Sequence, residues 1–130
     1  MRIVLVGGIG DDRAQGQTNG QVNLVLVGRG LVDDGASFTL TSGVVSHDPI
    51  HFGSSVYIFD GAINGFVRAA AIDLPRGLGI NAVSPGALQE SMGAYGPYFR
   101  GHEPVPAARV ALAHTKSAGG TRTGQVLEVL

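Results

Sequence analysis

The chain has 130 residues, of which 44% are hydrophobic and 15% charged, so its composition indicates one globular domain and not a disordered chain. Its net charge of −1 excludes the basic footprint of a protein that binds nucleic acid or an anionic membrane. The absence of cysteine excludes disulfides, thiolate catalysis and Cys-ligated metal sites.

Apolar runs in this sequence are short. The run at residues 3–6 is shorter than the apolar core of a signal peptide, and no segment approaches the roughly 20 apolar residues of a membrane span. The sequence therefore predicts no membrane span, and the cytoplasm is the expected location.

The N-terminal quarter begins with one clear strand signal. Residues 3–6 form an apolar, largely β-branched run that predicts a buried parallel strand. Residues 8–20 are predicted to form a loop, because polar residues alternate there with Gly8, Gly10, Gly16 and Gly20. Residues 21–28 are ambiguous by periodicity, and their continuous apolar run on its own favours a strand.

The middle of the chain contains a strand and a long helix. Residues 37–41 predict a second strand, and residues 54–74 predict a helix that ends at Pro75. One apolar stripe of this helix contains Phe59, Ile63, Phe66 and Ala70. A second stripe beside it contains Ile58, Ala62, Ala69 and Ile72. A helix with two apolar stripes needs a second partner besides the sheet.

The C-terminal part continues the alternation of strands and helices. Residues 79–83 predict a third strand, 106–117 a helix and 124–129 a last strand, with a proline- and glycine-rich stretch up to Pro106. This order predicts an α/β fold in a single domain, residues 1–130. We expect a parallel sheet of about four strands flanked by helices, with the first strand paired beside residues 37–41.

Several separate motifs carry a resemblance to a known family. The segment GFVRAAAIDLPRGLGINAVSPG (65–86) contains the spacing Asn-x-Val-x-Pro-Gly, at Asn81, Val83, Pro85 and Gly86. The segment SFTLTSG (37–43) ends a strand with Ser42, and the tail is TGQVLEVL. In this order the motifs resemble the short-chain dehydrogenase/reductase family over roughly 110 residues.

The resemblance implies a truncated Rossmann-like sheet and an oxidoreductase that uses NAD or NADP on a small carbonyl or alcohol. It places residues 21–28 in a helix, and it implies a catalytic role for Ser42. It also implies cofactor contacts at Gly7, Gly8, Gly10, Pro85, Gly86 and Leu88. The strand at residues 3–6 resembles the family's first strand, but the glycines continue into Asp11-Asp12, and a helix and three further strands have no counterpart.

The proton relay of the family is altered in this chain. The family uses a tyrosine with a lysine four residues later, because a nearby cation lowers the high pKa of tyrosine. Counting back from residue 65 puts Val56 at the tyrosine position and Asp60 at the lysine position. Tyr57 is the candidate catalytic tyrosine, one residue out of register; the other interpretation is a packed or interface aromatic.

Other combinations of reactive residues are weaker. The neighbours Ser46, His47 and Asp48 have the residue types of a triad but cannot form one along a single segment. His47 and His51 have the spacing of a zinc pair, but Pro49 lies between them, and we predict no metal site. An aromatic group lies where the family covers its substrate, at Tyr95, Tyr98, Phe99 and His102; a plain lid or interface cluster is the alternative.

Two functional hypotheses remain open at this stage. One is an NAD(P)-dependent oxidoreductase with a small-molecule substrate, and the other is a catalytically inactive remnant that acts as a binding or assembly module. The second stripe of helix 54–74 predicts a homodimer or homotetramer under both hypotheses.

Overall fold

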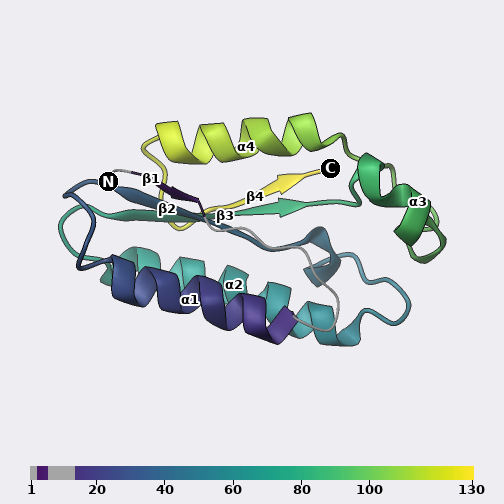
Figure 1. The fold of residues 1–130 in the computed structure, drawn as a ribbon, viewed down its shortest axis with the longest axis horizontal. Helices are drawn as coiled ribbons and strands as arrows, with labels where there is room; N and C mark the ends of the chain where they lie inside the picture. The colour runs from purple at the N-terminus through teal and green to yellow at the C-terminus, as the bar shows by residue number, and fades with distance from the viewer. Residues whose placement is uncertain (1–2, 6–13) are drawn as a thin grey trace.

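A computed structural model describes residues 3–5 and 14–130 of the chain. Within them, four parallel strands form one sheet in the order β1-β2-β3-β4 (Figure 1). The strands are β1 (Ile3–Leu5), β2 (Ser37–Thr41), β3 (Gly79–Pro85) and β4 (Val126–Val129). The expected α/β fold with four strands is confirmed, and β1 pairs beside β2 with Ile3 opposite Ser37, as predicted.

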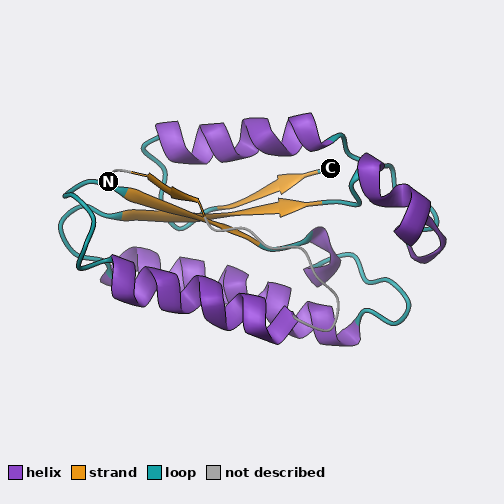
Figure 2. Cartoon of the chain, viewed as in Figure 1, coloured by secondary structure: helices purple, strands orange, loops and turns teal. Residues whose placement is uncertain are grey.

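Helices cover both faces of the sheet. The helices α1 (Ala14–Gly28) and α2 (Ser54–Asp73) pack against each other on one face, and α4 (Ala107–Gly119) covers the other (Figures 1 and 2). The 3₁₀ turns η1 (Val44–Ser46), η2 (Gln89–Ser91) and η3 (Gly96–Tyr98) and the short helix α3 (Met92–Tyr95) lie in the connections. No helix in the described part of the chain is both long enough and apolar enough to cross a bilayer.

Alternation along β2 divides its side chains between the two layers. Phe38 and Leu40 are fully buried in the core under α1 and α2. Thr39 points to the other face, where its hydroxyl lies 2.7 Å from that of Ser117 in α4. The core on the first face is therefore apolar, and the layer under α4 is partly held by hydrogen bonds.

The third crossover has the hand opposite to the first two. The strands advance in one direction across the sheet, while α4 lies on the face opposite to α1 and α2. Because βαβ crossovers are almost always right-handed, this arrangement makes the β3–α4–β4 crossover the left-handed one. It also carries the long excursion of residues 86–106 around the end of the sheet.

Three sequence predictions need correction. Residues 14–20 are not a loop, and residues 21–28 are not the strand that their pattern favoured but the helix that the resemblance implied, because both stretches belong to α1. Gly16 and Gly20 are tolerated in it, since α1 buries Val25 against the core. The third strand extends to Pro85, two residues beyond the prediction. The strand at residues 3–5 resembles the family's first strand in sequence, but its predicted pairing with the serine strand gives it the place of the fourth strand in a 3-2-1-4-5-6 sheet.

Asn81 ties three segments together under α4. Its amide nitrogen donates to the Arg122 carbonyl at 2.9 Å and to the Ser117 hydroxyl at 3.2 Å. Its amide oxygen accepts from the Gln125 backbone N–H at 3.0 Å. Asn81 is fully buried, so the motif residue has a structural task, which is to join β3 to α4 and to the turn before β4.

We expect Asn81→Ala to lower the free energy of unfolding by about 2–4 kcal/mol, because it removes a fully buried amide and its hydrogen bonds to the Arg122 carbonyl and the Gln125 N–H, and leaves the Ser117 hydroxyl with Thr39 as its partner. Urea unfolding followed by circular dichroism measures this change. The control Thr115→Ala removes an exposed hydroxyl from α4 and should change stability by less than about 0.5 kcal/mol. Equal effects of the two variants would contradict the assigned role of Asn81.

Candidate functional site

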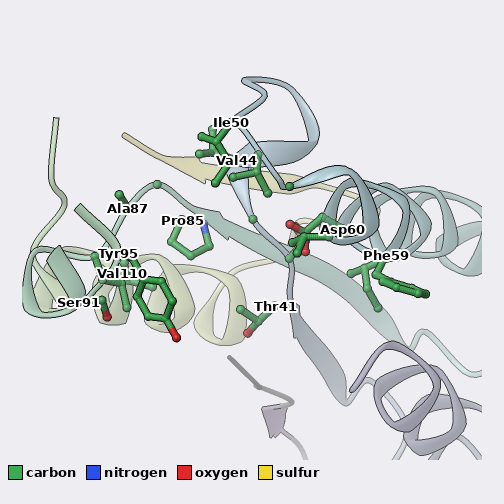
Figure 3. A pocket seen from close by; sticks show the side chains of 18 of the residues that line it. Thr41, Val44, Ile50, Phe59, Asp60, Pro85, Ala87, Ser91, Tyr95 and Val110 are labelled. Atoms are coloured by element: carbon green, nitrogen blue, oxygen red, sulfur yellow. The ribbon is translucent and has the colours of Figure 1, made fainter. Parts of the chain in front are cut away.

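A cleft of about 560 Å³ lies at the carboxyl ends of β2 and β3. Parallel sheets place ligand sites at this edge, and the volume falls in the usual range of roughly 300–1,000 Å³ for small-molecule sites. Side chains of the two strand ends, α1, α2, α4 and the 88–99 segment line it (Figure 3). In Figure 3, Asp60 and Phe59 of α2 lie on one side, and Pro85, Tyr95 and Val110 on the other.

Ser42, the predicted catalytic serine, lines this cleft and is joined to α2. Its hydroxyl donates to Oδ1 of Asn64 at 2.7 Å. Asn64 Nδ2 in turn donates to Ser46 Oγ at 3.2 Å, and Ser46 Oγ donates to the Gly43 carbonyl at 3.0 Å. This chain of hydrogen bonds fixes the end of β2 to the middle of α2, and sequence reasoning found only its first member.

Gln21 of α1 forms hydrogen bonds with the backbone at the end of β2. Its amide oxygen accepts from the Thr41 backbone N–H at 2.8 Å, and its amide nitrogen donates to the Thr41 carbonyl at 3.0 Å. The last described pair of β1 and β2 is Leu5 with Thr39, and Gln21 bonds the backbone of Thr41 two residues further on. No local pattern predicts this role of Gln21, since both contacts span 20 residues.

Val56 and Asp60 occupy the positions that the resemblance assigns to the catalytic tyrosine and lysine, and both line the cleft. A carbon atom added at Gly43 would lie 2.7 Å from Oδ2 of Asp60, so the carboxyl group rests directly against the backbone there. Burial raises the pKa of the Asp60 carboxyl to about 6. No hydrogen bond or ion pair joins Asp60 to another described residue.

Tyr57, the other predicted catalytic residue, does not line the cleft. Its hydroxyl donates to the Ile50 carbonyl at 2.6 Å and accepts from the Ile50 backbone N–H. Burial and, secondarily, the Asp48 carboxylate raise the pKa of Tyr57 above its ordinary value. Both findings disfavour Tyr57 as a proton carrier, since a general base needs a lowered tyrosine pKa; its catalytic role stays a prediction.

The histidine-rich loop after β2 forms no relay. Ser46 Oγ and Glu128 Oε1 both approach the same ring nitrogen of His47, Nδ1, at 3.2 and 3.3 Å, whereas a triad uses the two nitrogens separately. Within residues 3–5 and 14–130, no group of three or more His, Asp or Glu side chains lies close enough to hold a metal ion.

A flap formed by residues 89–104 covers one end of the cleft. Its base is closed by a short parallel bridge between Leu88 and Val105, and the Glu90 carboxylate accepts from the first N–H of α4 at 3.1 Å. Of the predicted aromatic group, Tyr95 and Phe99 line the cleft, whereas His102 contacts Phe99 edge-on and lies 3.5 Å from Asp48.

The predicted cofactor contacts divide into two groups. Pro85, Gly86 and Leu88 line the cleft, while Gly7, Gly8 and Gly10 lie outside the described residues.

The described lining does not fit a dinucleotide. The strand order within the described sheet does not reverse, so the switch point at which such sheets bind dinucleotides is absent there. Asp60 is the only Asp, Glu, Lys or Arg among the described lining residues, so no cation in this part faces a phosphate.

Comparisons with known proteins place this fold. No protein-family model matches the chain, and no curated protein matches it. The crystal structure of the protein lin1944 from Listeria innocua is 37% identical, with a TM-score of 0.89 over 99% of this chain and 72% of that one. A short chain dehydrogenase/reductase family protein is 23% identical, with a TM-score of 0.77 over 98% of this chain and 65% of its own. A small-chain dehydrogenase in complex with NADPH is 21% identical, with a TM-score of 0.75 over 97% of this chain and 65% of its own.

The sheet, the crossovers and the cleft define an α/β protein of the Rossmann-like class. The fold is that of the short-chain dehydrogenase/reductase structures that the chain matches, and the motifs around Ser42 and Asn81 are those that resemble this family. The chain spans 72% of the length of lin1944 and less than two thirds of the length of the other two proteins.

We expect Asp60→Asn to stabilise the protein at neutral pH. The pKa of Asp60 in the folded protein, about 6, lies above its ordinary value of 3.8, so the folded state favours the protonated carboxyl group. The stability that this protonation contributes is fully present below pH 3.8 and is lost as the pH rises through about 6. The variant should gain roughly 1 kcal/mol over the parent between about pH 4 and about pH 7, after allowance for solvent screening.

Urea unfolding at several pH values measures this difference. The control Asp73→Asn removes an exposed carboxylate from the end of the same helix and should change the pH profile much less. A constant difference between Asp60→Asn and the parent across this range would show that burial does not act on Asp60.

Proposed function

We propose that this protein is a non-catalytic member of its family that binds a small, largely apolar molecule in the cleft. One observation carries the proposal: a valine and a carboxyl group, Val56 and Asp60, stand in the cleft where the family's relay has tyrosine and lysine. A valine cannot transfer a proton, and a carboxylate raises the pKa of any phenol beside it. The nearest tyrosine, Tyr57, is bound to the Ile50 backbone instead.

A second candidate function is an NAD(P)-dependent oxidoreductase that acts on a small carbonyl or alcohol. Ser42 favours it, because this residue lies in the cleft close to Pro85 and Gly86 at the strand ends. The similarity to a small-chain dehydrogenase in complex with NADPH also supports it. For either function, a cytoplasmic location remains part of the proposal.

Titration with NADH and NADPH separates the two functions. We expect no binding up to millimolar concentrations and no oxidation of either nucleotide with small ketones and aldehydes, because the described cleft offers phosphates no cation. Protein fluorescence and absorbance of the reduced nicotinamide provide the two readouts, with an intact short-chain dehydrogenase as positive control.

Micromolar binding together with turnover would favour the oxidoreductase and sink the non-catalytic proposal. In that case Ser42→Ala and Tyr57→Phe test the two assigned catalytic residues. Unchanged rates in both variants would remove these assignments.

We also propose that α2 pairs with a second copy of the chain. Its outer stripe is exposed in the single chain, with Ile58 68% and Ile72 86% accessible, and Ala62 and Ala69 are exposed between them. Small and apolar residues on one helix face let a second helix approach closely. A homodimer or homotetramer through this stripe would bury it.

Light scattering at micromolar concentration tests this assembly. The parent should have the mass of a dimer or tetramer, and Ile58→Asp should shift it to the monomer, because a charge would be buried at the interface. The control Leu112→Asp places the same charge on an exposed residue of α4 and should leave the mass unchanged. A parent that is a uniform monomer would contradict the pairing.

A further inference from the structure

The hydroxyl group of Ser42 donates its only proton to another residue of the protein, Asn64. A carbonyl can only accept, so Ser46 donates its single proton to Gly43 and must accept from the amide nitrogen of Asn64. Asn64 therefore turns its oxygen toward Ser42, and Ser42 donates to it. What Ser42 offers to the cleft is its lone pairs, so it suits a ligand with a donor and not a carbonyl oxygen.

Asp60 adds a second acceptor to the same end of the cleft. Its carboxyl group rests against Gly43, the neighbour of Ser42 in the chain. The side chain is half-buried and has no partner among the described residues, although an ionised carboxylate can accept several hydrogen bonds. A half-buried carboxylate without a partner is costly, and burial raises its pKa accordingly. A cationic donor would relieve this cost.

Two further polar side chains of the lining, His114 and Gln21, are bound to neighbouring protein groups. Nδ1 of His114 donates to the Val110 carbonyl at 3.0 Å, so in the neutral ring the other nitrogen is an acceptor, 3.4 Å from Thr41 Oγ1. The amide of Gln21 uses its oxygen and its nitrogen on the Thr41 backbone. Beside Ser42 and Asp60, a ligand that carries N–H groups therefore finds acceptors, while the hydroxyl and amide donors of Gln17, Thr18, Ser91 and Tyr95 come from α1 and the 88–99 segment.

The rest of the cleft is apolar and partly aromatic. Phe59 lies beside Asp60, and Met92, Tyr95 and Phe99 line the flap side (Figure 3 labels Phe59, Asp60 and Tyr95). Aromatic faces attract ammonium groups as well as hydrocarbon. No Lys or Arg is among the described lining residues, so the described lining offers an anionic ligand no opposite charge.

We propose that the cleft binds a small apolar amine. Its ammonium group pairs with the Asp60 carboxylate and donates to Ser42 Oγ, and its hydrocarbon part lies against Phe59 and the aromatic residues of the flap. This inference rests on the proposed binding function and names the ligand class.

Three probes of one shape test the ligand class: benzylamine, benzyl alcohol and benzoate, each titrated by calorimetry into the full chain at neutral pH. Because a charge-assisted hydrogen bond is stronger than a neutral one, benzylamine should bind about tenfold tighter than benzyl alcohol, with benzoate weakest. Equal affinities for the amine and the alcohol, or no benzylamine binding at millimolar concentration, overturn the inference.

Variants locate the amine. Asp60→Asn should remove the preference for benzylamine over benzyl alcohol, while the control Asp73→Asn should keep it. If Asp60→Asn does not fold, Gly43→Ala provides a second route, because the added carbon displaces the Asp60 carboxyl group and should weaken benzylamine several-fold more than benzyl alcohol. A preference for benzylamine over benzyl alcohol that survives in both variants overturns the role of Asp60.

The two proposals fail in different ways. Equal binding of benzylamine and benzyl alcohol contradicts the amine preference and leaves the non-catalytic binding function in place. Turnover of NADH or NADPH contradicts the non-catalytic function whatever the amine result.

Discussion

The hydrogen bond from Ser42 to Asn64 is the interaction on which the site depends. It is 2.7 Å long and buried, and it joins the end of the central strand β2 to the middle of α2. The position of α2 decides which side chains reach the cleft, so this bond sets the place of Val56 and Asp60. The series of hydrogen bonds continues from Asn64 to Ser46 and on to the Gly43 carbonyl. Because a carbonyl only accepts, the donor of each hydrogen bond in this series is fixed.

The scaffold and the chemistry of this family are carried by separate residues. The side chains of Asn81 and Asn64 form hydrogen bonds that join several elements of the fold. Loss of either side chain would therefore weaken the fold itself. The relay positions on α2 face the open cleft, where a valine and a carboxyl group fit without disturbing the core. A protein can therefore keep the sheet, the crossovers and the cleft while it loses the proton relay.

The sequence predicted the elements whose patterns are local. Strand β2, helix α2 and the start of α4 were found within one residue, because their apolar periods and their proline and glycine ends are continuous. Helix α1 was missed by pattern because Gly16 and Gly20 interrupt it and its exposed leucines hide the period. The pairing of the first strand with residues 37–41 was predicted from the resemblance and from the family strands that have no counterpart here. The register of that pairing, with Ile3 opposite Ser37, is known only from the structure.

The site was predictable in its positions but not in its hydrogen bonding. Counting back along the resemblance assigned Val56 and Asp60 to the relay positions, and both residues line the cleft. The partners of Ser42 lie 22 residues away and those of Gln21 lie 20 away, so no local pattern reports them. These distant partners turn the serine from a donor into an acceptor. Together with the carboxyl group at Asp60, they give this end of the cleft two acceptors, which is what the proposed amine ligand requires.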